Sequence, residues 1–90
     1  MSAVKRIVLD VLKPHEPNVL EFAQAIAGLG ADYRVTLRVT EVDDKTQTTV
    51  IVIEADAIDF PQVIDTVSGL GGAVHSIDEV EVAGSPAARE

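Results

Sequence analysis

The residues with the clearest capacity for chemistry are two histidines and a pair of aspartates, His15, His75, Asp43 and Asp44. Imidazole nitrogens and carboxylate oxygens are common Zn²⁺ ligands, and carboxylates also suit a harder ion such as Ca²⁺. These four residues therefore form a candidate divalent-cation site, for Ca²⁺ or Zn²⁺. Their spacing matches no short metal-binding motif, so structural roles stay open. Aspartates are ordinary residues of hairpin turns, and His15 would order the proline-flanked loop in which it lies.

Patterns typical of enzymes are absent from the sequence. Ser68 and Ser76 lack the Gly-x-Ser-x-Gly context of an activated nucleophile. The glycines at 28–30 and 69–72 follow predicted helices, whereas the glycines of a phosphate-binding loop open a helix. The sequence therefore predicts a protein that is not an enzyme.

Composition narrows the class of protein further. The chain of 90 residues is the length of one domain, and 47% of it is apolar but only 3% aromatic. Without cysteine, disulfide scaffolds and Cys-based zinc, iron–sulfur or redox sites are excluded. A formal net charge of −8 argues against nucleic-acid or anionic-membrane partners. No apolar run reaches the roughly 20 residues that span a bilayer, and no signal peptide is evident, so we expect a soluble, cytoplasmic domain.

Six elements must position these side chains. Aliphatic and β-branched residues predict strands over residues 4–13, 33–42, 47–55 and 74–83. Helices are predicted after Asn18 and Asp59, where apolar residues recur at i, i+3, i+4 and i+7. Ile77 is out of phase with Val80 and Val82, which predicts a bulge near Asp78.

The two halves of the chain have the same physical construction. Aligning Asn18 with Asp59 in the sequence also aligns the Gly-Leu-Gly segment at 28–30, which ends the first helix, with the one at 69–71, which ends the second. Both a duplication and independent use of the same capping chemistry explain this agreement.

The element order β-α-β-β-α-β predicts the α+β, ferredoxin-like sandwich. In that fold a four-stranded antiparallel sheet has the strand order 4-1-3-2, and both helices cover one face. Residues 1–83 form this single domain, and residues 84–90 are predicted to be a disordered tail. The topology brings the end of the first strand, the hairpin turn and the start of the last strand to one end. His15, Asp43, Asp44 and His75 are therefore expected at the same end of the domain.

The face without helices is predicted to be an interaction surface. It carries aliphatic residues of the two central strands: Val8, Leu12, Val50 and Val52. A contiguous apolar patch of this kind marks an interface, so we expect a homo-oligomer formed through the open sheet face or the edge strands. Long neighbours such as Arg38 and Lys5 provide the alternative, which is shielding within one chain. Asp10 lies among these residues and is expected to pair with Arg38 or Lys5, or with an arginine of a neighbouring subunit.

Three segments resemble signatures of domain of unknown function family 211, a family of small, mostly archaeal proteins. They are Lys5 to Pro17 (KRIVLDVLKPHEP), Val39 to Thr46 (VTEVDDKT) and Gly71 to Val80 (GGAVHSIDEV). The resemblance extends to about Ala83. It implies a ferredoxin-like fold and a tendency to form homo-oligomers, and it implies no activity.

Two hypotheses of function follow. The first is a non-enzymatic, self-assembling module that binds a divalent cation or small ligand at the His/Asp end or at a subunit junction. The alternative is a regulatory sensor of a small metabolite, resembling ACT modules, which share this strand order. ACT-like binding favours a glycine-rich strand–helix junction, but the glycines here follow the helices.

Overall fold

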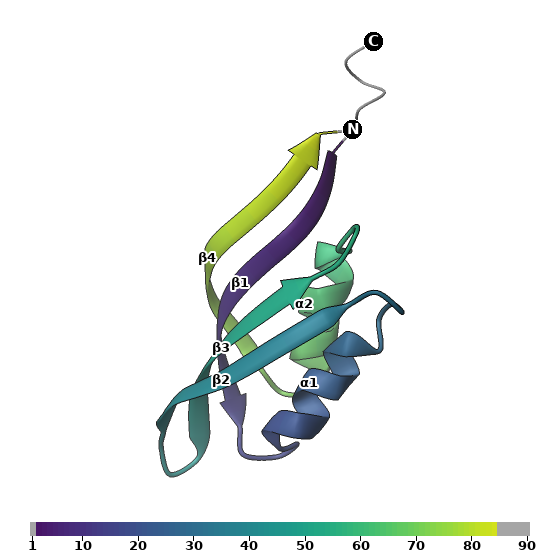
Figure 1. Ribbon diagram of the computed structural model, residues 1–90. Helices are drawn as coiled ribbons and strands as arrows, with labels where there is room; N and C mark the ends of the chain where they lie inside the picture. The colour runs from purple at the N-terminus through teal and green to yellow at the C-terminus, as the bar shows by residue number, and fades with distance from the viewer. Residues whose placement is uncertain (1, 85–90) are drawn as a thin grey trace.

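A computed structural model describes residues 2–84 and confirms the predicted element order (Figure 1). The elements are β1 (Ser2–Pro14), α1 (Val19–Ala27), β2 (Arg34–Val42), β3 (Thr46–Glu54), α2 (Phe60–Gly69) and β4 (Ala73–Gly84). No helix in this part of the chain is long and apolar enough to cross a membrane.

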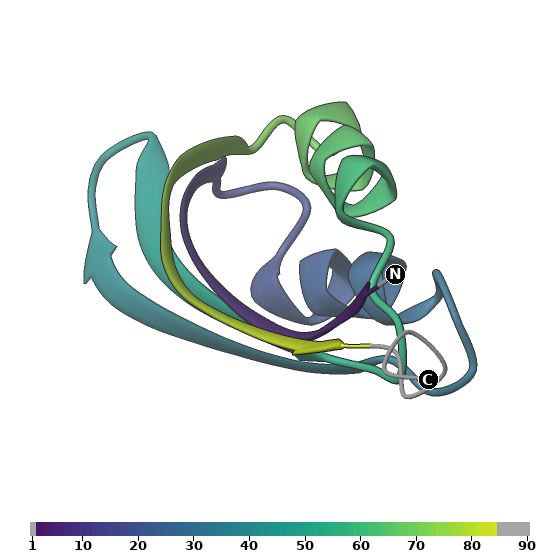
Figure 2. The same ribbon diagram turned by 90° about the horizontal axis from the view of Figure 1, so that it is seen from above.

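The four strands form one antiparallel sheet in the order β2-β3-β1-β4, which is the predicted order read from the other edge. The sheet is strongly curved, and both helices lie on its concave face (Figure 2). We call the opposite, helix-free side the convex face. The fold is therefore the predicted ferredoxin-like sandwich.

Both helices begin at the predicted capping residues. The side chain of Asn18 accepts a hydrogen bond from the backbone N–H of Glu21, whose carboxylate accepts one from the backbone N–H of Asn18. Asp59 caps α2 by accepting from the backbone N–H of Gln62, and a proline occupies the first turn. Local sequence therefore fixes where each helix starts.

The core fills the space between the concave face and the helices. It consists of aliphatic side chains from β1, β3, both helices and the segment before α2, with one aromatic ring, Phe22, from α1. Its members are Ile7, Leu9, Val11, Phe22, Ile26, Ile51, Ile53, Ile58, Val63 and Val67. From Arg6 onward in β1, and throughout the paired part of β3, the odd-numbered positions therefore face the helices and the even-numbered positions face outward.

Irregular pairing divides β4 into segments. Val8 pairs with Glu79 and Leu9 with Ile77, so Asp78 is bulged, as predicted. A second irregularity leaves His75 without a paired residue on β1, and a third leaves Lys5 of β1 without a paired residue on β4. Gly84 still pairs with Ser2, so β4 includes a residue that the sequence assigned to the tail. The rest of the predicted tail, residues 85–90, lies outside the described part of the chain.

The strands β1 and β4 continue beyond the rest of the sheet, as Figure 1 shows. Pairing between β1 and β3 stops at Arg6 and Glu54, whereas pairing between β1 and β4 continues to Ser2 and Gly84. This end of the sheet is thus a two-stranded ribbon, which is weakly stable unless its apolar side is covered.

Two glycines near the C-terminal end of α2 provide a matched test of the packing. A methyl group at Gly72 would lie 2.9 Å from Phe22 and from Val67, whereas nothing lies within 4 Å of the same position at Gly69. We expect Gly72→Ala to lower the free energy of unfolding by about 1–3 kcal/mol through overpacking. Gly69→Ala should raise it by about 0.4–1 kcal/mol, because alanine restricts the unfolded chain. Urea denaturation of both variants measures the difference, and equal effects would contradict this packing.

Candidate functional site

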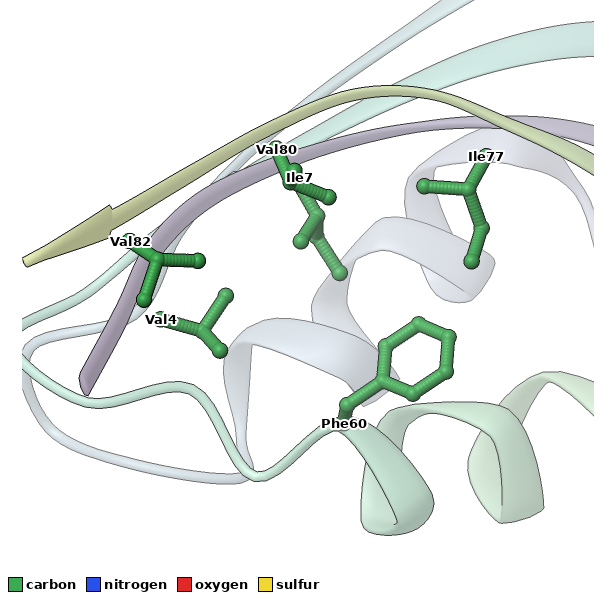
Figure 3. A pocket seen from close by; sticks show the side chains of 6 residues that line it. All are labelled: Val4, Ile7, Phe60, Ile77, Val80 and Val82. Atoms are coloured by element: carbon green, nitrogen blue, oxygen red, sulfur yellow. The ribbon is translucent and has the colours of Figure 1, made fainter. Parts of the chain in front are cut away.

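An apolar groove lies on the concave face of the sheet, beside the edge strand β4. It has a volume of about 220 Å³ and is lined only by apolar side chains (Figure 3). The lining residues are Val4, Ile7, Phe60, Ile77, Val80 and Val82. We call this surface the β4 groove.

The groove exists because the helices stop short of the extended ribbon. Phe60, the first residue of α2, forms one wall, and the side chains of β1 and β4 form the other (Figure 3). The three residues from β4 remain accessible: Ile77 is 50% exposed, Val80 57% and Val82 51%. Isolated exposed aliphatic residues are common, but a contiguous set that lines one groove indicates an interaction surface.

Acidic side chains occupy the opposite side of the same strand. Glu79 and Glu81 pair with Val8 and Arg6 and therefore project from the convex face. Arg6 connects Glu79 of β4 to Glu54 of β3. Its Nε lies 2.9 Å from Glu79 and its Nη1 lies 2.9 Å from Glu54. The hydrogen bonds to Glu79 and Glu54 raise the pKa of Arg6. The edge strand thus presents acids on one face and aliphatics on the other.

The convex face carries the four predicted aliphatic residues. Val8, Val50 and Val52 are half-buried, and Leu12 is 42% exposed. Val50 lies directly opposite Arg38, one of the long side chains expected to shield this face. The β4 residues are therefore more exposed than these valines, and sequence analysis placed the main apolar surface on the other side of the sheet. The spacing of Val80 and Val82, two residues apart on one strand, was the sequence signal that could have located this surface.

Asp10 and His75 line a second hollow, which lies on the convex face. Its volume is about 260 Å³, and Leu12 and Thr48 complete its lining. The expected ion pairs of Asp10 with Arg38 or Lys5 are wrong: among residues 2–84, the ion pairs are those of Arg6 with Glu54 and Glu79. Arg6 lies directly opposite Glu54 on β3, and Glu79 lies opposite Val8, the next outward residue of β1.

His15 has a structural partner at the hairpin turn. Its Nε2 lies 2.8 Å from the backbone carbonyl of Asp43, which ties the proline-flanked loop to the turn. The carboxylate of Asp43 accepts a hydrogen bond from the backbone N–H of Asp44, and the Asp43 N–H donates to the Thr46 carbonyl. Within the described residues, no three His, Cys, Asp or Glu side chains are grouped to hold an ion. The loop that carries His15 thus meets the turn that carries Asp43 and Asp44, while His75 lines the convex hollow.

Lys13 is a buried cation that sequence analysis did not identify. Its side chain is fully buried at the end of the core, and its Nζ lies 5.4 Å from the centre of the Phe22 ring. The ammonium donates to the Pro14 carbonyl at 2.7 Å and to Oε1 of Gln47 at 2.9 Å. The sequence did indicate this burial, because Lys13 lies on the same side of the strand as the core residues Ile7, Leu9 and Val11. Burial lowers the pKa of Lys13, although the nearby Glu16 raises it.

This burial predicts a pH-dependent stability. Because the pKa of Lys13 is lowered only in the folded state, the unfolded chain binds more protons between that pKa and the ordinary value of 10.5. The free energy of unfolding should therefore rise as the pH rises through this window. The same gain should be lost as the pH falls back through it. Lys13→Met should remove this contribution, so the urea midpoint of the unmodified chain should rise more steeply than that of the variant as the pH approaches 10.5 from below. Parallel profiles would show that Lys13 titrates alike in both states.

Comparison with known proteins places the chain in a family. Residues 5–87 match domain of unknown function family 211, described as uncharacterized ArCR. An uncharacterized protein of Methanocaldococcus jannaschii, MJ0319, is 40% identical over 80 residues. This similarity covers 89% of the present chain and 82% of the relative. The chain belongs to domain of unknown function family 211.

Proposed function

We propose that this chain is a non-enzymatic, self-assembling module in which a second copy covers the β4 groove. The observation that carries the proposal is the groove itself, with three half-exposed β-branched side chains from a single edge strand. Burying a side chain of this size stabilises an interface by about 1.5–3 kcal/mol. Three such residues, together with Phe60, supply an apolar centre of the type found in protein interfaces.

The charges of the chain favour a second copy as the occupant. The β4 strand carries Glu79 and Glu81, whereas the other edge strand, β2, carries Arg34 and Arg38, both exposed. Neither arginine has an ion pair within residues 2–84. The chain therefore contains both a surface that needs covering and a surface of complementary charge.

Light scattering over a dilution series tests self-assembly. We expect a molar mass that is a multiple of 9.5 kDa at high concentration and that falls on dilution. A mass of 9.5 kDa at every concentration would sink the proposal.

Cation binding remains a prediction, centred on His15, Asp43, Asp44 and His75. Since no three of these ligands gather within the described residues of one copy, a second copy would have to supply part of such a site. We expect calorimetric titration with Ca²⁺ or Zn²⁺ to show binding that His15→Ala and Asp43→Ala both weaken by at least about tenfold. Binding that is unchanged in these variants, or the absence of any heat, would contradict this site.

A further inference from the structure

We propose that the hollow on the convex face binds a primary alkylammonium group. The hollow is lined by four residues of a single copy, which are Asp10, Leu12, Thr48 and His75. The inference therefore goes beyond self-assembly and does not depend on it. The hollow measures about 260 Å³, which is smaller than the pockets of roughly 300–1,000 Å³ that hold drug-sized ligands. Its occupant is therefore a small molecule or the end of a single side chain.

Strand pairing places the lining side chains around one point of the sheet. Leu12 follows Asp10 on the outward side of β1, and Thr48 of β3 lies directly opposite Leu12. His75 comes from β4, the other neighbour of β1, at the irregularity that leaves it without a paired residue. A bulge of this kind redirects a side chain, and bulges are frequent beside functional sites. The hollow thus receives side chains from three adjacent strands.

The polar groups of the hollow are not used by the fold. Within residues 2–84, the Asp10 carboxylate, the Thr48 hydroxyl and the His75 ring have no hydrogen-bond partner. Ser76 lies directly opposite Asp10, but its hydroxyl donates to the carboxylate of Asp78 instead, at 2.7 Å. Three polar groups from three strands therefore face one hollow with their hydrogen-bonding capacity free for a ligand.

The charge of the hollow selects a cation. Arg38 lies two strands away from Asp10, on the far side of Val50, which corresponds to roughly 9–10 Å of sheet. This is more than twice the N···O separation of about 4 Å that defines an ion pair. The carboxylate of Asp10 is therefore available to a positively charged ligand, and the net charge of −8 attracts cations to the chain as a whole.

The lining groups fit an alkylammonium group rather than a metal ion. Among residues 2–84, no three His, Cys, Asp or Glu side chains are grouped to hold an ion, and the hollow contains two residues of these types. A primary ammonium has three N–H donors, and the hollow offers a carboxylate, a hydroxyl oxygen and an imidazole nitrogen as acceptors. Leu12, which is 42% exposed, provides an apolar surface for the methylene groups beside the ammonium.

Titration with n-butylammonium, followed through the amide NMR spectrum, tests this site. We expect saturable shifts of amides around the hollow, and at least about tenfold weaker binding in Asp10→Asn, which loses a charge-assisted hydrogen bond. Thr48→Val, which removes one acceptor and keeps the shape of the side chain, should weaken binding by at least about threefold. Asp65→Asn is the matched control, because it removes the same charge from an exposed position on α2 and should leave the affinity unchanged.

The choice of ligand separates hydrogen bonding from charge alone. Tetramethylammonium carries the same charge but has no N–H donor, so we expect it to bind at least about tenfold more weakly than n-butylammonium. Putrescine represents a free amine, and Nα-acetyl-lysine methylamide represents the side chain of a protein partner. Tighter binding of either one supports the ammonium site and assigns its source.

Three results would overturn the inference: no saturable shift with n-butylammonium, equal affinities of Asp10→Asn and Asp65→Asn, or equal affinities for n-butylammonium and tetramethylammonium. His15→Ala distinguishes this site from the predicted Ca²⁺ or Zn²⁺ site, because it should weaken binding of the metal ion and leave binding of n-butylammonium unchanged. A chain that is monomeric at every concentration and still binds n-butylammonium through Asp10 would contradict self-assembly and support this inference.

Discussion

Val80→Lys should weaken self-assembly by at least about tenfold, because it places a charge in the β4 groove and removes the burial of a valine worth about 1.5–3 kcal/mol. Val80 is the most exposed residue of the groove, at 57%, so the isolated fold should tolerate the substitution. Light scattering should show that the mass falls towards 9.5 kDa at concentrations where the unmodified chain is assembled.

Ser68→Lys is the control for this experiment. It adds the same charge at an exposed position near the end of α2, away from Phe60 and the groove. Its mass should match that of the unmodified chain, and circular dichroism should show both variants folded. If Val80→Lys assembles as well as Ser68→Lys, the groove is not an interface.

Phe22→Ala should have the largest effect on stability, a loss of about 3–5 kcal/mol from a domain whose total is roughly 5–13 kcal/mol. Phe22 is the aromatic ring of the buried core, and it is fully inaccessible. It also lies beneath the ammonium of Lys13, so its removal leaves a cavity beside a buried charge.

Urea denaturation measures this loss, and Leu20→Ala is its control. Leu20 lies on the same helix but is 64% exposed, so its truncation should cost less than about 0.5 kcal/mol. A loss below about 1 kcal/mol for Phe22→Ala would contradict the packing described for the core.

Local chemistry made most of the fold predictable from the sequence. Asn18 and Asp59 start the helices because their side chains satisfy free backbone N–H groups, and this depends only on residues nearby. Alternation in β1 and β3 separated the core positions from the outward ones. The phase change at Ile77 was enough to predict the bulge at Asp78.

The candidate surface was less predictable, because it depends on how far each strand extends. The β4 groove exists because β1 and β4 extend beyond the end of β3 and beyond the helices. No local pattern in the sequence encodes this difference in strand length. The ion pairs of Arg6 likewise depend on the register of distant strands, which places Arg6 opposite Glu54 and Val8 opposite Glu79. Lys13 was overlooked for a different reason: its charge suggested exposure, although its phase indicated burial.

Amide hydrogen exchange along β4, measured at several protein concentrations, tests most directly whether a second copy covers this strand. The described structure leaves one side of β4 without a partner, whereas β3 is paired on both sides. We expect exchange of the amides at residues 79–84 to slow as the concentration rises, while exchange in β3 stays constant. Exchange in β4 that is equally fast at every concentration would contradict the account.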